Sequence, residues 1–106
     1  MAEEKLVIST AGSREEALRI AHALVEEQLA ACVNIVGPIE SVYRWRGKVE
    51  STQEFLMLIK TIASKSASAF SRIRELHSYD LPEAIEISIV DGSREYLKWI
   101  HESCAQ

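Results

Sequence analysis

Histidine and cysteine, the side chains that most often bind metals or act as nucleophiles, are few and scattered in this chain. Cys32 and Cys104 lie far apart and form no CxxC motif, so we expect two reduced, structural thiols. The three histidines form no HxH or HxxxH pair, and no EF-hand loop is present. His22 is expected to be a surface histidine at the edge of a helix. Spacing alone therefore indicates no metal site.

The motifs of common enzyme and nucleic-acid-binding classes are also missing. The sequence has no GxSxG, Walker or GxGxxG loop, and residues 10–13 are a poor glycine-rich anion loop, although the following helix N-terminus can attract an anion. RNA-recognition sheets need aromatic residues on their central strands and a basic surface. Here Phe55 is the only aromatic residue of its strand, and the net charge is −4. We expect no nucleic-acid partner.

The length and hydropathy of the chain indicate one globular domain spanning residues 1–106. A chain of 106 residues with 47% hydrophobic residues can bury a single core without disulfides. No apolar run approaches the roughly 18 residues that a membrane span needs. The first residues show no basic segment followed by an apolar one, so no signal peptide is visible. We therefore expect a cytoplasmic protein with no membrane partner.

The stretch from Ala30 to Thr61 must position much of the chemistry, because it predicts two long strands joined at Arg46-Gly47. Gly37-Pro38 interrupts the first strand and predicts a bulge or a bend. The second strand, expected over 48–61 with a further irregularity at 50–53, contains the run FLMLI at 55–59. That run is apolar on both alternating faces, whereas a sheet covered by one helix layer needs only one apolar face.

The flanking segments predict a strand at 6–8 and a helix that begins with a capping box of Ser13 and Glu16. After the hairpin, a helix capped by Ser64 or Ser66 ends near residue 79, before the Leu81-Pro82 step. A strand with one wetter face follows at 83–90, and a last helix runs to about 103, with Tyr96, Leu97, Ile100 and Cys104 facing inward.

The order β-α-β-β-α-β with an added C-terminal helix predicts an α+β, ferredoxin-like fold with both main helices on one sheet face. Either Leu56 and Leu58, or Phe55, Met57 and Ile59, would then contact water in a monomer. Burying such side chains is worth about 1.5–3 kcal/mol each. We therefore expect a second copy of the chain to cover the open face.

Five motifs in the same order resemble those of the CutA family, named for divalent-cation tolerance. They are LAACVNI at 29–35, YRWRGK at 43–48, LIKT at 58–61, HSYDLPE at 77–83, and DGS with YL and WI at 91–100. The resemblance implies a ferredoxin-like fold and a tight homotrimer held by the long hairpins, similar in architecture to the PII nitrogen regulators. It also implies a role in tolerance of copper or other divalent cations, with Cu(II) binding and no required cofactor.

Matching to the family's motifs implies a ligand site in a cleft between subunits. The residues it assigns are Cys32, Tyr43, Trp45, Lys60, Tyr79, Glu83 and Trp99, with His77 as the metal ligand. These groups would suit a small anion or metabolite, acid–base chemistry, or copper held by thiolate and imidazole. These residues could also have purely structural roles. Lys60 and Glu83 would then form an ion pair at an interface, Tyr79 and Trp99 would be packing residues, and His77 would cap the end of a helix.

The chain departs from the copper motif of some relatives, because Ser9 and Leu76 occupy the other two ligand positions. The leading hypothesis is a homotrimeric binding or regulatory protein for divalent-metal tolerance. The alternatives are a PII-like sensor of a small anionic metabolite that uses Lys60, or an uncharacterised enzyme that uses His77, Tyr79 and Glu83. Of these, a protein without enzymatic activity is favoured.

Overall fold

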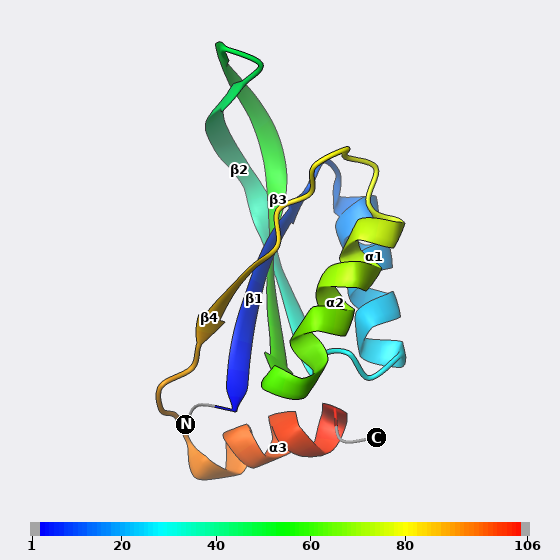
Figure 1. The fold of residues 1–106 in the computed structure, drawn as a ribbon, viewed down its shortest axis with the longest axis vertical. Coiled ribbons are helices and arrows are strands. Elements are labelled where there is room, and N and C mark those ends of the chain that lie inside the picture. Colours follow the sequence, from blue (N-terminus) through cyan, green and yellow to red (C-terminus); the bar gives the residue numbers. More distant parts are fainter. Residues whose placement is uncertain (1–2, 105–106) are drawn as a thin grey trace.

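A computed structural model describes residues 3–104. One antiparallel sheet has the strand order β2-β3-β1-β4, with α1 and α2 on the same face and α3 across one end (Figure 1). The elements in chain order are β1 (Glu4–Ala11), α1 (Arg14–Glu26), β2 (Cys32–Trp45), β3 (Lys48–Ile62), α2 (Ala63–Leu76), β4 (Ile85–Ser88) and α3 (Arg94–Cys104). The predicted ferredoxin-like arrangement with an added helix is confirmed. No helix within the described residues is long and apolar enough to cross a membrane.

The β2–β3 hairpin projects well beyond the helices (Figure 1). Trp45 pairs with Lys48, so Arg46 and Gly47 form a two-residue turn with φ values of 52° and 81°. Two positive φ values match the turn type that suits the twist of a hairpin, which explains the glycine at the second position. The predicted turn is confirmed. The prediction of an irregularity at 50–53 is wrong, because the pairing of β2 with β3 is continuous there.

The predicted bulge at Gly37-Pro38 is confirmed. Val36 pairs with Leu56 and Ile39 pairs with Glu54, so two residues of β2 lie opposite Phe55 alone. A Cβ atom on Gly37 would lie 2.5 Å from Cδ2 of the Phe55 ring. The bulge therefore needs a glycine at position 37, because any larger residue would overlap the Phe55 ring.

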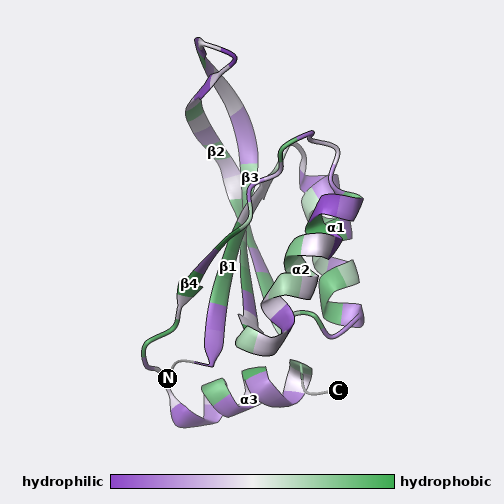
Figure 2. Ribbon diagram, viewed as in Figure 1, coloured by the Kyte–Doolittle hydropathy of each residue, from purple (hydrophilic) through white to green (hydrophobic). Residues whose placement is uncertain are grey.

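The two faces of the sheet are both apolar but have different surroundings. Met57 and Ile59 face the helices and are fully buried, together with Val7 of β1. Cross-strand partners in an antiparallel sheet share a face, so the pairing register defines the opposite one. We call it the open face. Its apolar residues are Leu6, Ile8, Val36, Leu56, Leu58, Ile85 and Ile87. Figure 2 shows hydrophobic residues along this sheet and a hydrophilic hairpin tip.

The open face corrects the prediction for the last strand, which is also shorter than expected. Ile85 and Ile87 pair with Ile8 and Leu6 and are about half exposed, at 50% and 48%. All four residues of β4 are exposed, so the strand has no drier face, and its isoleucines lie on the open face. Lys5 on the opposite face forms an ion pair with Glu86 and a hydrogen bond to Ser88.

Two predictions for the helices are wrong in detail. Neither Ser64 nor Ser66 caps α2, because β3 runs directly into the helix and Ile62 occupies the N-cap position. In α3, Ile100 and Cys104 are buried and Leu97 packs against them, as expected. Tyr96 does not face inward: its side chain is 42% exposed.

A buried carboxylate on α1 anchors the segment that follows α2. The Ser13 hydroxyl accepts a hydrogen bond from the amide of Glu16, as the capping box predicts. The Glu16 carboxylate turns instead to Ser78 and accepts hydrogen bonds from its amide at 2.7 Å and its hydroxyl at 3.1 Å. Burial raises the pKa of Glu16, but the hydrogen bonds from Ser78 are among the effects that outweigh it, and the pKa is lowered from 4.5.

We expect Gly37→Ala to destabilise the fold by about 1–3 kcal/mol, because its methyl group would overlap the Phe55 ring. Chemical denaturation would measure the loss. A Phe55→Leu background is the control, since a smaller side chain leaves room for the methyl group. An equal loss in both backgrounds would show that the Phe55 contact is not the cause.

Glu16→Gln should lower the free energy of unfolding at pH 7 by about 1 kcal/mol, because a neutral amide accepts weaker hydrogen bonds from Ser78. The folded chain binds the Glu16 proton more weakly than the unfolded chain does. This stabilisation is therefore present above pH 4.5 and is lost as the pH falls through the lower folded-state pKa. The two stability curves should converge in that range. The exposed Glu15→Gln is the control, and parallel curves for Glu16→Gln and wild type would contradict the assignment.

Candidate functional site

The eight residues assigned by motif fall into two groups at opposite ends of the sheet. Cys32, Lys60 and Trp99 lie at the end crossed by α3, which we call the lysine end. The remaining five, Tyr43, Trp45, His77, Tyr79 and Glu83, come from the hairpin arm and the segment after α2. Four of these five line a cavity at what we call the cavity end.

At the lysine end, Cys32 and Lys60 are cross-strand partners and share the open face. The Lys60 ammonium donates a hydrogen bond to the Tyr96 hydroxyl at 3.2 Å, and the rings of Tyr96 and Trp99 are 5.3 Å apart. The Cys32 thiol lies 3.8 Å from the Asn34 side-chain oxygen. Tyr96 is thus part of this group, although its place in an apolar helical stripe suggested a core residue.

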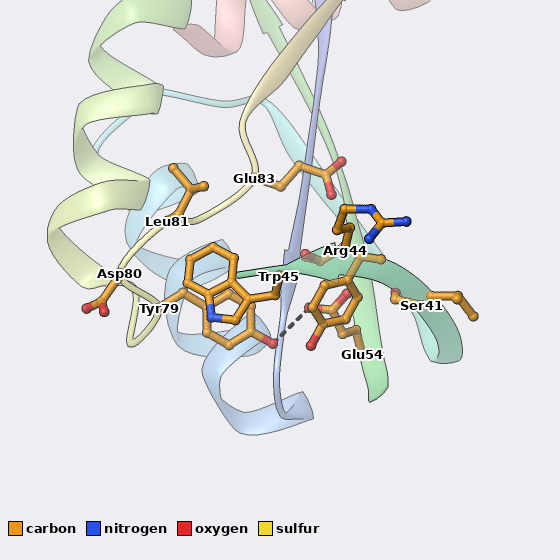
Figure 3. Close-up of a pocket in the computed structure, with 11 residues that line it drawn as sticks. Ser41, Arg44, Trp45, Glu54, Tyr79, Asp80, Leu81 and Glu83 are labelled. Atoms are coloured by element: carbon orange, nitrogen blue, oxygen red, sulfur yellow. Dashed lines mark hydrogen bonds between the residues drawn. The ribbon is translucent and has the colours of Figure 1, made fainter. Parts of the chain in front are cut away.

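At the cavity end, the twisted hairpin and the segment after α2 line a cavity of about 660 Å³ that is open to solvent (Figure 3). The side chains that line it are Thr10, Ser41, Val42, Tyr43, Arg44, Trp45, Glu54, Tyr79, Asp80, Leu81 and Glu83. The Tyr79 hydroxyl donates a hydrogen bond of 2.8 Å to the Glu54 carboxylate. Burial and this carboxylate both raise the pKa of Tyr79, so the phenol stays protonated.

The cavity end has a negative electrostatic character. Its lining carries three carboxylates, on Glu54, Asp80 and Glu83, and one guanidinium, on Arg44. Burial and the charge of Glu54 raise the pKa of Glu83. Two carboxylates that share a partly desolvated site oppose each other's ionisation, so a positive group between them would be stabilised.

Sequence reasoning missed Glu54, which is only 7% exposed. A carboxylate directly before an apolar run looks like the wet end of a strand, and its hydrogen bond comes from Tyr79 in a segment that is distant in the sequence. Arg44 and Asp80 were also missed. Both lie inside motifs already identified, at 43–48 and 77–83, and this is the signal by which they could have been found.

His77 lies behind the cavity and does not line it. Its side chain is fully buried. Its Nδ1 accepts a hydrogen bond from the Tyr79 amide at 3.1 Å, so the ring proton is on Nε2, which donates to the Thr10 carbonyl at 2.6 Å. Glu16 lies 3.6 Å from Nδ1. Both ring nitrogens are therefore occupied by bonds that position Tyr79.

The side chains of a single chain do not fit a copper site. Between residues 3 and 104, no three histidine, cysteine or acidic side chains gather closely enough to hold a metal ion. Ser9, at one ligand position of the relatives' motif, is fully buried, and its hydroxyl has no hydrogen-bond partner among the residues that the structure describes. Leu76, at the other, is the last residue of α2. Copper ligation by His77 stays a prediction.

The two ends are too far apart for one small ligand to contact both within a chain. Lys60 pairs with Leu6, and Thr10, four residues further along β1, lines the cavity. At about 3.3 Å per residue, this separation is roughly 13 Å along the strand. The open face lies between the two ends. The groups assigned by motif can therefore meet only if a second chain contributes one of the ends.

Comparison with known proteins agrees with the motifs. The sequence matches the family of the CutA1 divalent ion tolerance protein over residues 5–103. It is 47% identical over 100 residues to the divalent-cation tolerance protein CutA of Thermus thermophilus, covering 94% of this chain and 97% of that protein. It is also 47% identical over 94 residues to the protein of that name from Archaeoglobus fulgidus, covering 89% and 91%.

Solved structures of CutA proteins share the fold closely. The structure of CutA from Xylella fastidiosa superposes with a TM-score of 0.95 at 43% identity, covering 97% of this chain and 99% of that one. The Thermus thermophilus structure gives a TM-score of 0.92 over 94% and 97% of the two chains. With the family match spanning nearly all of its length, this chain belongs to the CutA1 divalent ion tolerance family.

Proposed function

We propose that this protein is a homotrimeric binding protein of divalent-cation tolerance, with its ligand sites in the clefts between subunits. The proposal is supported above all by the open face, an apolar sheet face that is left uncovered. It lies between the lysine end and the cavity end, each of which holds only part of the residues assigned by motif. A neighbouring subunit that covers this face would also bring its lysine end toward the cavity end of the first. A site of that kind explains why the motif residues are divided within each chain.

The open face is large enough to stabilise association. Val36, Ile85 and Ile87 are 46%, 50% and 48% exposed, and four further apolar side chains share the face. Full burial of such a side chain is worth about 1.5–3 kcal/mol, so covering the exposed half of each contributes roughly half of that. The sum over several residues is consistent with a permanent assembly. The projecting hairpins supply further contact surface.

Sensing of a small anionic metabolite, as in PII proteins, is the second candidate function. It is favoured by the Lys60 ammonium, which lies on the open face beside the Tyr96 hydroxyl. An anion would bind at the lysine end, because the cavity end carries an excess of carboxylates. Enzymatic activity has no comparable support, since the Tyr79 phenol and the His77 ring are both held in structural hydrogen bonds.

Sedimentation should give a particle of three times the 11.9 kDa chain mass even at low micromolar concentration. Leu58→Glu should lower that mass, because it places a charge at the centre of the open face, opposite Ile8. Leu18→Glu is the matched control, because Leu18 is an exposed leucine of α1 on the opposite side of the sheet. A wild-type monomer, or a Leu58→Glu trimer as stable as the control, would refute the assembly.

A role of His77 as a Cu(II) ligand would require its ring to leave the bonds to Thr10 and Tyr79; in that case His77→Ala should weaken Cu(II) binding, and isothermal titration of wild type and variant would measure it. The exposed His22 of α1 provides the control variant, His22→Ala. Because His77 also positions Tyr79, circular dichroism must show that the variant remains folded. Unchanged affinity in a folded His77→Ala protein would remove His77 as a ligand. An equal loss in His22→Ala would indicate nonspecific surface binding.

A further inference from the structure

The walls of the cavity are aromatic. Tyr43 and Trp45 of β2 and Tyr79 of the segment after α2 line it, with Leu81 beside them. In Figure 3 the Trp45 and Tyr79 rings approach the same space from different parts of the chain. Aromatic faces carry partial negative charge and attract cations that lie within about 6 Å. In this structure Trp45 already has a cation near its ring, the Arg46 guanidinium at 5.4 Å from the ring centre.

The cavity also contains a nearly buried acid, Glu54, and the one guanidinium of the lining, on Arg44, offsets only part of the charge of its three carboxylates. Glu54 is more than nine-tenths buried, and the Tyr79 hydroxyl is its one hydrogen-bond partner within residues 3–104. A carboxylate accepts up to about four hydrogen bonds when ionised. Glu83 adds a second acid at the same cavity, which raises the demand for a positive ligand.

The shape and chemistry of the lining favour an organic cation over an inorganic one. A divalent metal ion needs several oxygen, nitrogen or sulfur ligands at short distance, and in the described part of the chain no three acidic, histidine or cysteine side chains lie close enough together to hold one. An alkylammonium ion needs fewer polar contacts, because its carbon atoms pack against aromatic rings. A volume of about 660 Å³ lies within the range of small-molecule sites.

We propose that the cavity between the hairpin arm and residues 79–83 binds the ammonium group of a small organic cation. Glu54 and Glu83 supply the negative charge, and Tyr43, Trp45 and Tyr79 supply aromatic walls. The inference rests on the proposed function, because it names the ligand class of that site. It concerns the cavity end alone, so it can fail while the trimer and the division of the site between subunits still hold.

The test compares butylammonium chloride with butan-1-ol, which has the same carbon chain and no charge. Both are titrated into the full-length protein at constant ionic strength, and the shifts of the two tryptophan indole N–H signals are followed by NMR. We expect butylammonium to bind at least tenfold more tightly than butan-1-ol and to shift the signal that Trp45→Phe removes. Glu83→Gln should weaken butylammonium binding at least tenfold, because it neutralises an exposed acid of the cavity.

Glu26→Gln is the matched control, since it removes an exposed charge at the last residue of α1, outside the cavity lining, and it should leave the affinity unchanged. Equal affinity for butylammonium and butan-1-ol would overturn the proposal, as would wild-type affinity in Glu83→Gln or no binding of butylammonium. Sedimentation of the same samples tests the proposed function separately. A protein that sediments as a trimer but does not bind butylammonium would refute only the proposed ligand class.

Discussion

A four-stranded sheet with two apolar faces and helices on only one of them is the constraint on which this molecule depends. The helices bury Val7, Met57 and Ile59, and the open face keeps Leu56, Leu58 and their neighbours at the surface. Apolar surface of that extent is rarely left in water. The same register that separates the two faces also places Lys60 and Cys32 on the open one. In the proposed trimer, association and ligand contact would therefore be linked through one set of strands.

The second level of organisation consists of polar bonds that hold the segment after α2 against the rest of the domain. Glu16 anchors Ser78, His77 joins the Thr10 carbonyl to the Tyr79 amide, and Tyr79 reaches Glu54 on β3. Each link is buried or partly buried, where an unpaired group would be costly. This network determines where one wall of the cavity lies. A residue that motif comparison assigns to metal binding thus also has an architectural role.

Local chemistry made much of the fold predictable from the sequence. The turn needs positive φ values at Arg46 and Gly47, and the helix start at Ser13 needs a hydroxyl cap, so each follows from a few neighbouring residues. The errors arose where contacts between segments that are distant in the sequence determine the structure. Ser66 looks like a cap, but the continuous passage from β3 into α2 leaves Ile62 at that position. Tyr96 lies in an apolar helical stripe but bonds to Lys60 across the open face.

The site was less predictable, because its geometry depends on segments that meet only in the folded chain. Motif comparison found Tyr79 and Glu83 but not Glu54, which is nearly buried and accepts a hydrogen bond from Tyr79, 25 residues further along the chain. It also grouped eight residues that one chain places at two ends of a sheet. No spacing rule reveals such a division, since residues that are close in an assembly need not be close in either chain.

The separation of the lysine and cavity ends has a consequence for genetics. In a closed ring of identical chains, each cleft would take one end from each of two neighbours, so every chain would serve two clefts. A chain defective at Lys60 placed beside a chain defective at Glu83 would put both defects into one shared cleft. The opposite flanks of the same two chains would remain intact. Two alleles that are each inactive alone would then restore a fraction of working clefts when expressed together.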